Sequence, residues 1–161
     1  MIQTSDINEL LEEARSELKR ADHLVFVSLK YTRTVDVIKN VIERLINGYE
    51  LGCQILLENS KNKGLIKEYP SGIGTKIELL TNLLSYDAVI QEHIRLFVLL
   101  RKLNKAEFSR MEEYRRHVRM IAAIDTGEVY EIKIDTVKEY YEKLTAFINT
   151  IKNIVSEKKD D

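Results

Sequence analysis

Apolar residues recur at every third or fourth position over most of the chain, which is the pattern of amphipathic α-helices. The stretches with this pattern span residues 7–30, 35–59, 76–84, 87–103 and 135–155. Residues suited to capping a helix N-terminus stand near their starts: Asp6, Thr34, Ser85 or Asp87, and Asp135. Because only residues 31–33 separate the first two helices, these should form an antiparallel hairpin. The pattern predicts a mainly α protein, an antiparallel bundle of about five helices.

Two segments inside these helices depart from a regular stripe. Residues 24–29 are apolar at nearly every position, so this end of the first helix should be buried on more than one side. Gly48 and Gly52 lie four residues apart within the second helix. Each costs about 1 kcal/mol of helix propensity relative to alanine, so a packing reason is expected. Two small residues on one face would let a neighbouring helix come close.

Breaker residues and alternation mark the non-helical parts. Residues 61–76 contain Pro70 and three glycines, which predicts a solvated loop. Residues 107–116 are predicted to form about two helical turns. Residues 117–124 and 129–134 alternate around a turn signal, which predicts a small β-hairpin before the last helix. An isolated hairpin is marginal in water, so it should pack on the bundle or pair with a second chain.

Length and composition exclude several classes of protein. At 161 residues the chain is long enough to bury a sizeable core and should form a single domain over residues 1–161. It is 44% hydrophobic and 32% charged, which excludes a disordered chain. The 25 basic and 26 acidic residues nearly balance, which excludes a histone-like polycation. Any affinity for nucleic acid must therefore come from local clustering of charge.

Other chemical signals in the chain are weak. The one cysteine, Cys53, permits no internal disulfide, and no stretch resembles a signal peptide or a membrane span, so a cytoplasmic protein without membrane contact is expected. Scattered histidines without metal-ligand spacing predict no metal and no cofactor. Cys53 has apolar neighbours and should belong to the core, and His93 should lie at the edge of the core with a satisfied hydrogen bond. High lysine, glutamate and isoleucine content favours a thermophilic source.

Positive charge gathers between residues 91 and 124. The candidate nucleic-acid-binding residues there are Arg101, Lys102, Arg110, Tyr114, Arg115, Arg116 and Arg119. Arginine binds phosphate through a bidentate fork, and Tyr114 can stack on a base. The same run can instead form a solvated face, in which the arginines pair with Glu112 and Glu113.

The pattern resembles the HEPN superfamily (higher eukaryotes and prokaryotes nucleotide-binding domains), and in particular uncharacterised archaeal proteins of that type. The stretches that carry the resemblance are EEARSELKRADHLVFVSLKYT, VIERLINGYELGCQILLE, LLRKLNKAEFSRMEEYRRHVRMI and TVKEYYEKLTAFINTI. The resemblance implies an antiparallel bundle of helices and a homodimer with a cleft between its subunits. Some members are metal-independent ribonucleases, and others bind RNA or nucleotides without catalysis.

The ribonucleases of this superfamily have an arginine, four to six residues and then a histidine. Arg110 and His117 fit this spacing, although Met111 stands where a polar residue is usual. Histidine would carry protons near neutral pH, and arginine would hold the phosphate. The sequence favours a non-catalytic module that binds RNA or a nucleotide through its basic stretch. A toxin-like ribonuclease using Arg110 and His117 and a structural protein–protein interaction module are the alternatives.

Overall fold

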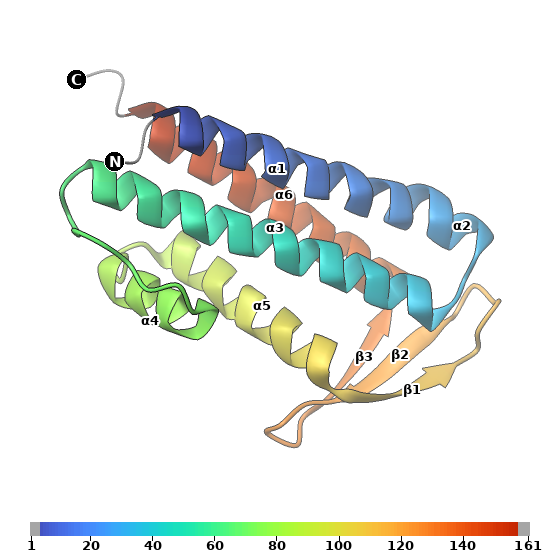
Figure 1. Ribbon diagram of the computed structural model, residues 1–161. Helices are drawn as coiled ribbons and strands as arrows, with labels where there is room; N and C mark the ends of the chain where they lie inside the picture. The colour runs from blue at the N-terminus through green and yellow to red at the C-terminus, as the bar shows by residue number, and fades with distance from the viewer. Residues whose placement is uncertain (1–3, 158–161) are drawn as a thin grey trace.

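Helices form most of the protein in the computed structural model, which describes residues 4–157 (Figure 1). They are α1 (Thr4–His23), the π-helical turn η1 (Leu24–Ser28), α2 (Leu29–Tyr31), α3 (Val35–Asn62), α4 (Ile73–Leu83), α5 (Ala88–Lys105) and α6 (Ile134–Glu157). The strands β1 (Glu107–Met111), β2 (Arg119–Ala123) and β3 (Val129–Lys133) form an antiparallel sheet between α5 and α6. The mainly α fold with a small sheet before the last helix is confirmed.

Two of the predicted N-caps hold in the structure. The Thr34 side chain accepts a hydrogen bond from the backbone N–H of Val37, and Asp87 accepts one from Ile90. These bonds satisfy N–H groups that have no partner inside the helix. Asp6 instead lies in the first turn of α1, which begins at Thr4, and Asp135 lies in the first turn of α6. There both acidic residues suit the positive end of the helix dipole.

The close approach predicted at Gly48 and Gly52 is confirmed, and the approaching helix is α6. A Cβ on Gly48 would lie 2.6 Å from a methyl carbon of Leu144, and one on Gly52 would lie 2.5 Å from the Phe147 ring. Figure 1 shows α1, α3 and α6 side by side, with α4 and α5 beyond α3. The two glycines thus let α3 and α6 pack at short range.

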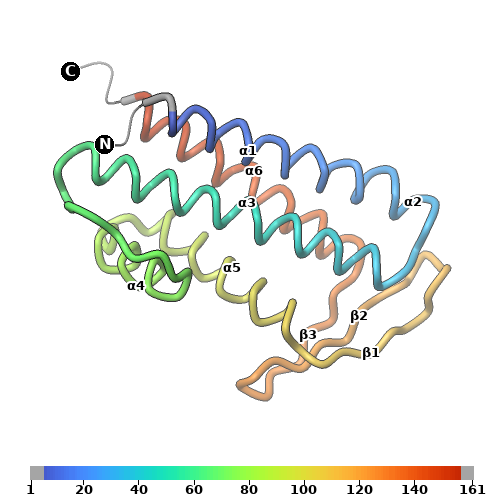
Figure 2. Tube along the Cα trace, viewed as in Figure 1, coloured from blue at the N-terminus to red at the C-terminus, as the bar shows by residue number. Residues whose placement is uncertain are grey.

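The sheet covers one end of the bundle and packs on it within the same chain. Met120, Ala122 and Ile132 point into the core and are almost fully buried. The prediction of helical turns over residues 107–116 is wrong, because residues 107–111 pair with β2 as strand β1. Figure 2 shows the chain passing from α5 through the sheet into α6. Neither edge of the sheet has a further strand among the described residues.

The predicted core positions of Cys53 and His93 are confirmed. Burial raises the pKa of the Cys53 thiol to about 12, so this thiol stays protonated and unreactive at neutral pH. The Tyr49 hydroxyl lies 3.1 Å from Nδ1 of His93. Burial raises the pKa of Tyr49, so its hydroxyl stays protonated and shares a hydrogen bond with the imidazole. The Phe147 ring packs on His93 with 4.9 Å between the ring centroids.

Acidification should destabilise the protein through His93. Burial lowers the pKa of His93 below the ordinary value, so between those two values the unfolded chain binds more protons than the folded chain. The free energy of unfolding should therefore fall as the pH drops through about 6.5. Urea unfolding at about pH 7.5 and pH 5 should show a smaller loss of stability in His93→Gln than in wild type. The exposed His23 provides the control His23→Gln, which should lose as much stability on acidification as wild type. An equal loss of stability in the two variants would contradict this role for His93.

Candidate functional site

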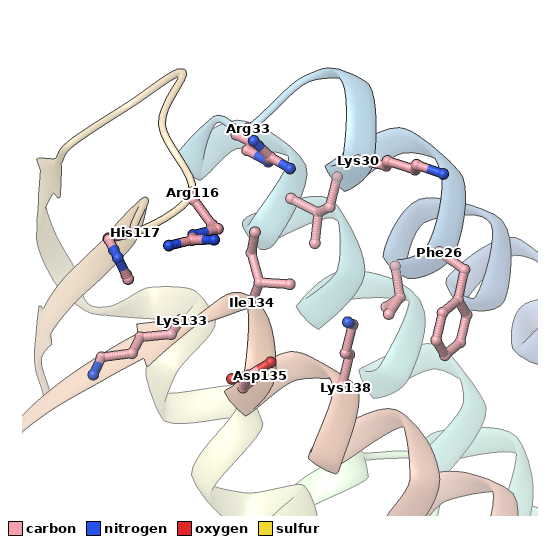
Figure 3. A pocket seen from close by; sticks show the side chains of 11 residues that line it. Phe26, Lys30, Arg33, Arg116, His117, Lys133, Ile134, Asp135 and Lys138 are labelled. Carbon is pink, nitrogen blue, oxygen red and sulfur yellow. The ribbon is translucent and has the colours of Figure 1, made fainter.

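A cleft of about 450 Å³ opens at the end of the bundle that carries the sheet (Figure 3). Three parts of the chain form it: the segment from η1 through α2 to the connection before α3, the loop between β1 and β2, and the junction of β3 with α6. Its lining residues are Val25, Phe26, Leu29, Lys30, Arg33, Arg116, His117, Lys133, Ile134, Asp135 and Lys138. We call this site the basic cleft.

Positive charge dominates the lining of the basic cleft. The cations are Lys30, Arg33, Arg116, Lys133 and Lys138, against the carboxylate of Asp135. Lys133 pairs with Glu131 at 3.1 Å. The other four cations form no ion pair with any residue that the structure describes. The cleft therefore concentrates charge that the chain itself leaves largely uncompensated.

Arg33 has one donor that the described chain leaves without a partner. Its Nε atom is buried and has no hydrogen-bond partner among the described residues. A buried donor without a partner costs about 1–3 kcal/mol.

Two long-range hydrogen bonds hold the loop between β1 and β2 against the start of α3. The backbone N–H of Tyr114 donates to the carbonyl oxygen of Arg33 at 2.6 Å. The backbone N–H of Val35 donates to the Glu113 carboxylate at 2.9 Å, which satisfies another free donor of α3. Glu113 also pairs with Arg110 at 3.6 Å. This attachment fixes the loop that carries the Arg116 side of the cleft.

The same loop contains two strained backbone conformations. Glu112 and Tyr114 have φ values of 51° and 68°, in the left-handed region that residues with a Cβ rarely adopt. Each costs on the order of 1 kcal/mol and persists only where neighbouring contacts enforce it. The loop that brings Arg116 and His117 to the cleft is thus held by tertiary contacts and not by local preference.

The π-helical turn η1 forms the opposite wall. The backbone N–H of Leu29 donates to the carbonyl oxygen of Leu24, five residues earlier, so the helix is wider here than an α-helix. Val25 and Leu29 point into the core, whereas Phe26 is 47% exposed at the cleft. The prediction that residues 24–29 are buried on more than one side is therefore wrong, because Phe26 and Val27 face outward. Such π turns are frequent at functional sites.

The fold separates the residues that the sequence groups into one basic stretch. Arg116 and His117 line the basic cleft. Arg110 does not; it pairs with Asp36 at 2.9 Å, and this hydrogen bond raises the pKa of its guanidinium. Arg119 pairs with Glu112, and the bond lowers the pKa of that carboxyl, so the pair stays ionised. These two arginines thus form salt bridges, as the alternative of a salt-bridged face expects.

The other candidates also lie outside the lining of the cleft. Lys102 pairs with Asp125 at 3.5 Å, and Arg101 is half-buried beside it on α5. Tyr114 is 78% exposed, and Arg115 is exposed as well. The use of Arg110 and His117 as a catalytic pair stays a prediction; Arg110 on β1 pairs with Asp36 and Glu113, whereas His117 lies in the cleft.

Most of the cleft was not predicted from the sequence. Lys30, Arg33, Lys133 and Lys138 come from two segments far apart in the chain, and no motif or spacing connects them. The one available signal was the phenylalanine within residues 24–29, which Lys30 and Arg33 follow in the chain. A phenylalanine in this segment could equally belong to the core. Only the three-dimensional arrangement shows that it lines a cleft.

Comparison of the chain with family models, with curated proteins and with solved structures gives no match in any of the three. Among the described residues, no helix has the length and apolarity needed to cross a bilayer. Within the same part of the chain, no group of three or more histidine, cysteine, aspartate or glutamate residues is placed to hold a metal ion.

Proposed function

We propose that this protein binds a nucleotide, or RNA through its nucleotide phosphates, in the basic cleft, and that it does so without catalysing a reaction. The convergence of Lys30, Arg33, Arg116 and Lys138 without carboxylate partners carries this proposal. Arg110 and Arg119, by contrast, are neutralised by acidic neighbours. Phosphate is the common biological anion that such a group of arginines and lysines fits.

The cleft also has suitable dimensions and electrostatics for a nucleotide. A volume of about 450 Å³ lies within the range of small-molecule sites. The cleft lies at the N-terminal end of α6, where the helix dipole adds to the attraction for an anion. His117 and Asp135 add hydrogen-bonding groups for hydroxyls or base edges.

Salt dependence tests this proposal. If three or four cations contact phosphates, the affinity for single-stranded RNA should fall about 20- to 50-fold between roughly 50 and 200 mM salt. Fluorescence anisotropy with a labelled oligonucleotide measures this change. The same sequence with an uncharged methylphosphonate backbone serves as the control and should not bind. Binding that ignores salt, or no binding at the lower salt concentration, would contradict the proposal.

Incubation of the same RNA with the protein separates binding from catalysis. We expect the RNA to stay intact on a denaturing gel. Cleavage that disappears in His117→Ala would establish the ribonuclease alternative instead. We also propose, from the HEPN resemblance, that the protein forms a homodimer; the open edges of β1 and β3 offer backbone groups for such pairing.

A further inference from the structure

We infer that the basic cleft recognises the base of a nucleotide as well as its phosphate, with the Phe26 ring as the stacking surface. This inference rests on the proposed function. It is carried by the position, exposure and support of the Phe26 side chain.

Phe26 lies where a base attached to a bound phosphate can reach it. Figure 3 shows its ring at one end of the cleft, with Lys138 between it and Asp135. His117 and Lys133 lie at the other end, and Arg33 and Arg116 lie between. Arg33, Arg116 and Lys133 therefore lie apart from the aromatic ring in one cleft, as phosphate and base do in a nucleotide, and Lys138 lies beside the ring.

Contacts with α6 hold the Phe26 ring in place. Tyr141 meets it edge to face, with 5.7 Å between centroids and 80° between ring planes. The Tyr141 hydroxyl donates to Asp22 on α1 at 2.9 Å, which fixes Tyr141 between two helices. Lys138 Nζ lies 5.9 Å from the Phe26 centroid, close enough for a cation–π contact. A ring held in this way loses little further freedom when a base stacks on it.

Phe26 packs on Tyr141 and still leaves apolar surface exposed at the cleft. Val25 and Leu29 already supply the buried face of this segment, so Phe26 adds an apolar side chain that is 47% exposed. The local π-helix brings it to the cleft at the expense of regular α-helical geometry. Every base has an aromatic face, so a phenylalanine platform predicts recognition of any nucleobase and not of one sequence.

Two ligands that differ only in the base test the inference. Adenosine 5′-monophosphate should bind about 5- to 100-fold more tightly than ribose 5-phosphate, because stacking adds to the phosphate contacts. In Phe26→Leu this difference should disappear, with the affinity for ribose 5-phosphate unchanged. Phe26→Tyr keeps an aromatic ring and should retain the difference in affinity between the two ligands. Isothermal titration calorimetry measures each affinity, and thermal unfolding shows whether each variant is folded.

Tyr31 provides the matched control. It is 78% exposed on the same segment but does not line the cleft, so Tyr31→Leu should leave both affinities unchanged. Equal binding of the two ligands by the wild type, or an equal loss of both in Phe26→Leu, would overturn the inference while leaving phosphate binding in place. Failure of both ligands to bind the wild type would instead overturn the proposed function.

Discussion

Replacing Gly52 with alanine should lower the free energy of unfolding by about 2 kcal/mol. The new Cβ would lie 2.5 Å from Cε2 of Phe147 and 2.8 Å from Cδ1 of Ile151, and both side chains are fully buried. Overpacking of this kind costs about 1–3 kcal/mol, and the better helix propensity of alanine returns about 1 kcal/mol. The cost should lie at the upper end, because Phe147 is itself packed between Tyr49 and His93 and has little room to move.

Urea unfolding followed by circular dichroism measures this change, and two other glycines calibrate it. Gly74→Ala on α4 meets no atom within 4 Å, so it should leave stability unchanged or raise it by up to about 1 kcal/mol. Gly48→Ala meets only the end of the Leu144 side chain, which can shift, so its cost should lie between those of the other two. Equal stability of all three variants would contradict tight packing of α3 on α6.

The features that the sequence predicted well are those encoded in local patterns. The spacing of Gly48 and Gly52 implied a close helix contact because a helix places residues four apart on one face. Thr34 and Asp87 marked helix starts because capping needs only a short polar side chain near free N–H groups. A capping side chain bonds to an N–H group only a few residues away. The glycine pair requires only that some helix packs against it, whichever helix that is.

The segment of residues 107–116 was predicted wrongly because its structure depends on partners far along the chain. Glutamate, arginine and methionine are good helix formers, and only pairing with β2 makes residues 107–111 a strand. The left-handed residues Glu112 and Tyr114 are neither glycine nor asparagine, so nothing local marks the turn. Contacts with Arg33 and Val35 enforce it instead.

The same limit explains why the sequence found only part of the candidate site. Clustering along the chain selected Arg116 and His117 together with arginines that the fold neutralises. Which arginine has a carboxylate partner depends on residues such as Asp36 and Glu131, which are distant in sequence. The remaining cations of the cleft are isolated in sequence and are brought together only by the packing of α6 against the first helical segment.

Arg116→Ala should weaken binding of single-stranded RNA by about 10- to 100-fold, which is the value of a charge-assisted hydrogen bond to phosphate. Arg115→Ala should change the affinity by less than about 3-fold, since a surface charge outside the contact contributes less than about 1 kcal/mol. The two arginines are neighbours on one exposed loop, and only Arg116 lines the basic cleft. Fluorescence anisotropy at one low salt concentration compares the two variants directly.

This pair of variants isolates the contact from the general field of the protein. Both substitutions remove one positive charge from nearly the same place, so their effects through long-range attraction should be similar. Neither side chain forms an ion pair or a hydrogen bond with the described residues, so neither loss should lower the free energy of unfolding. A difference in affinity between the two variants can then come only from the contact that the Arg116 side chain makes inside the cleft. Equal weakening by both variants would show that RNA binds the outer face of the loop, and the basic cleft would no longer be the site.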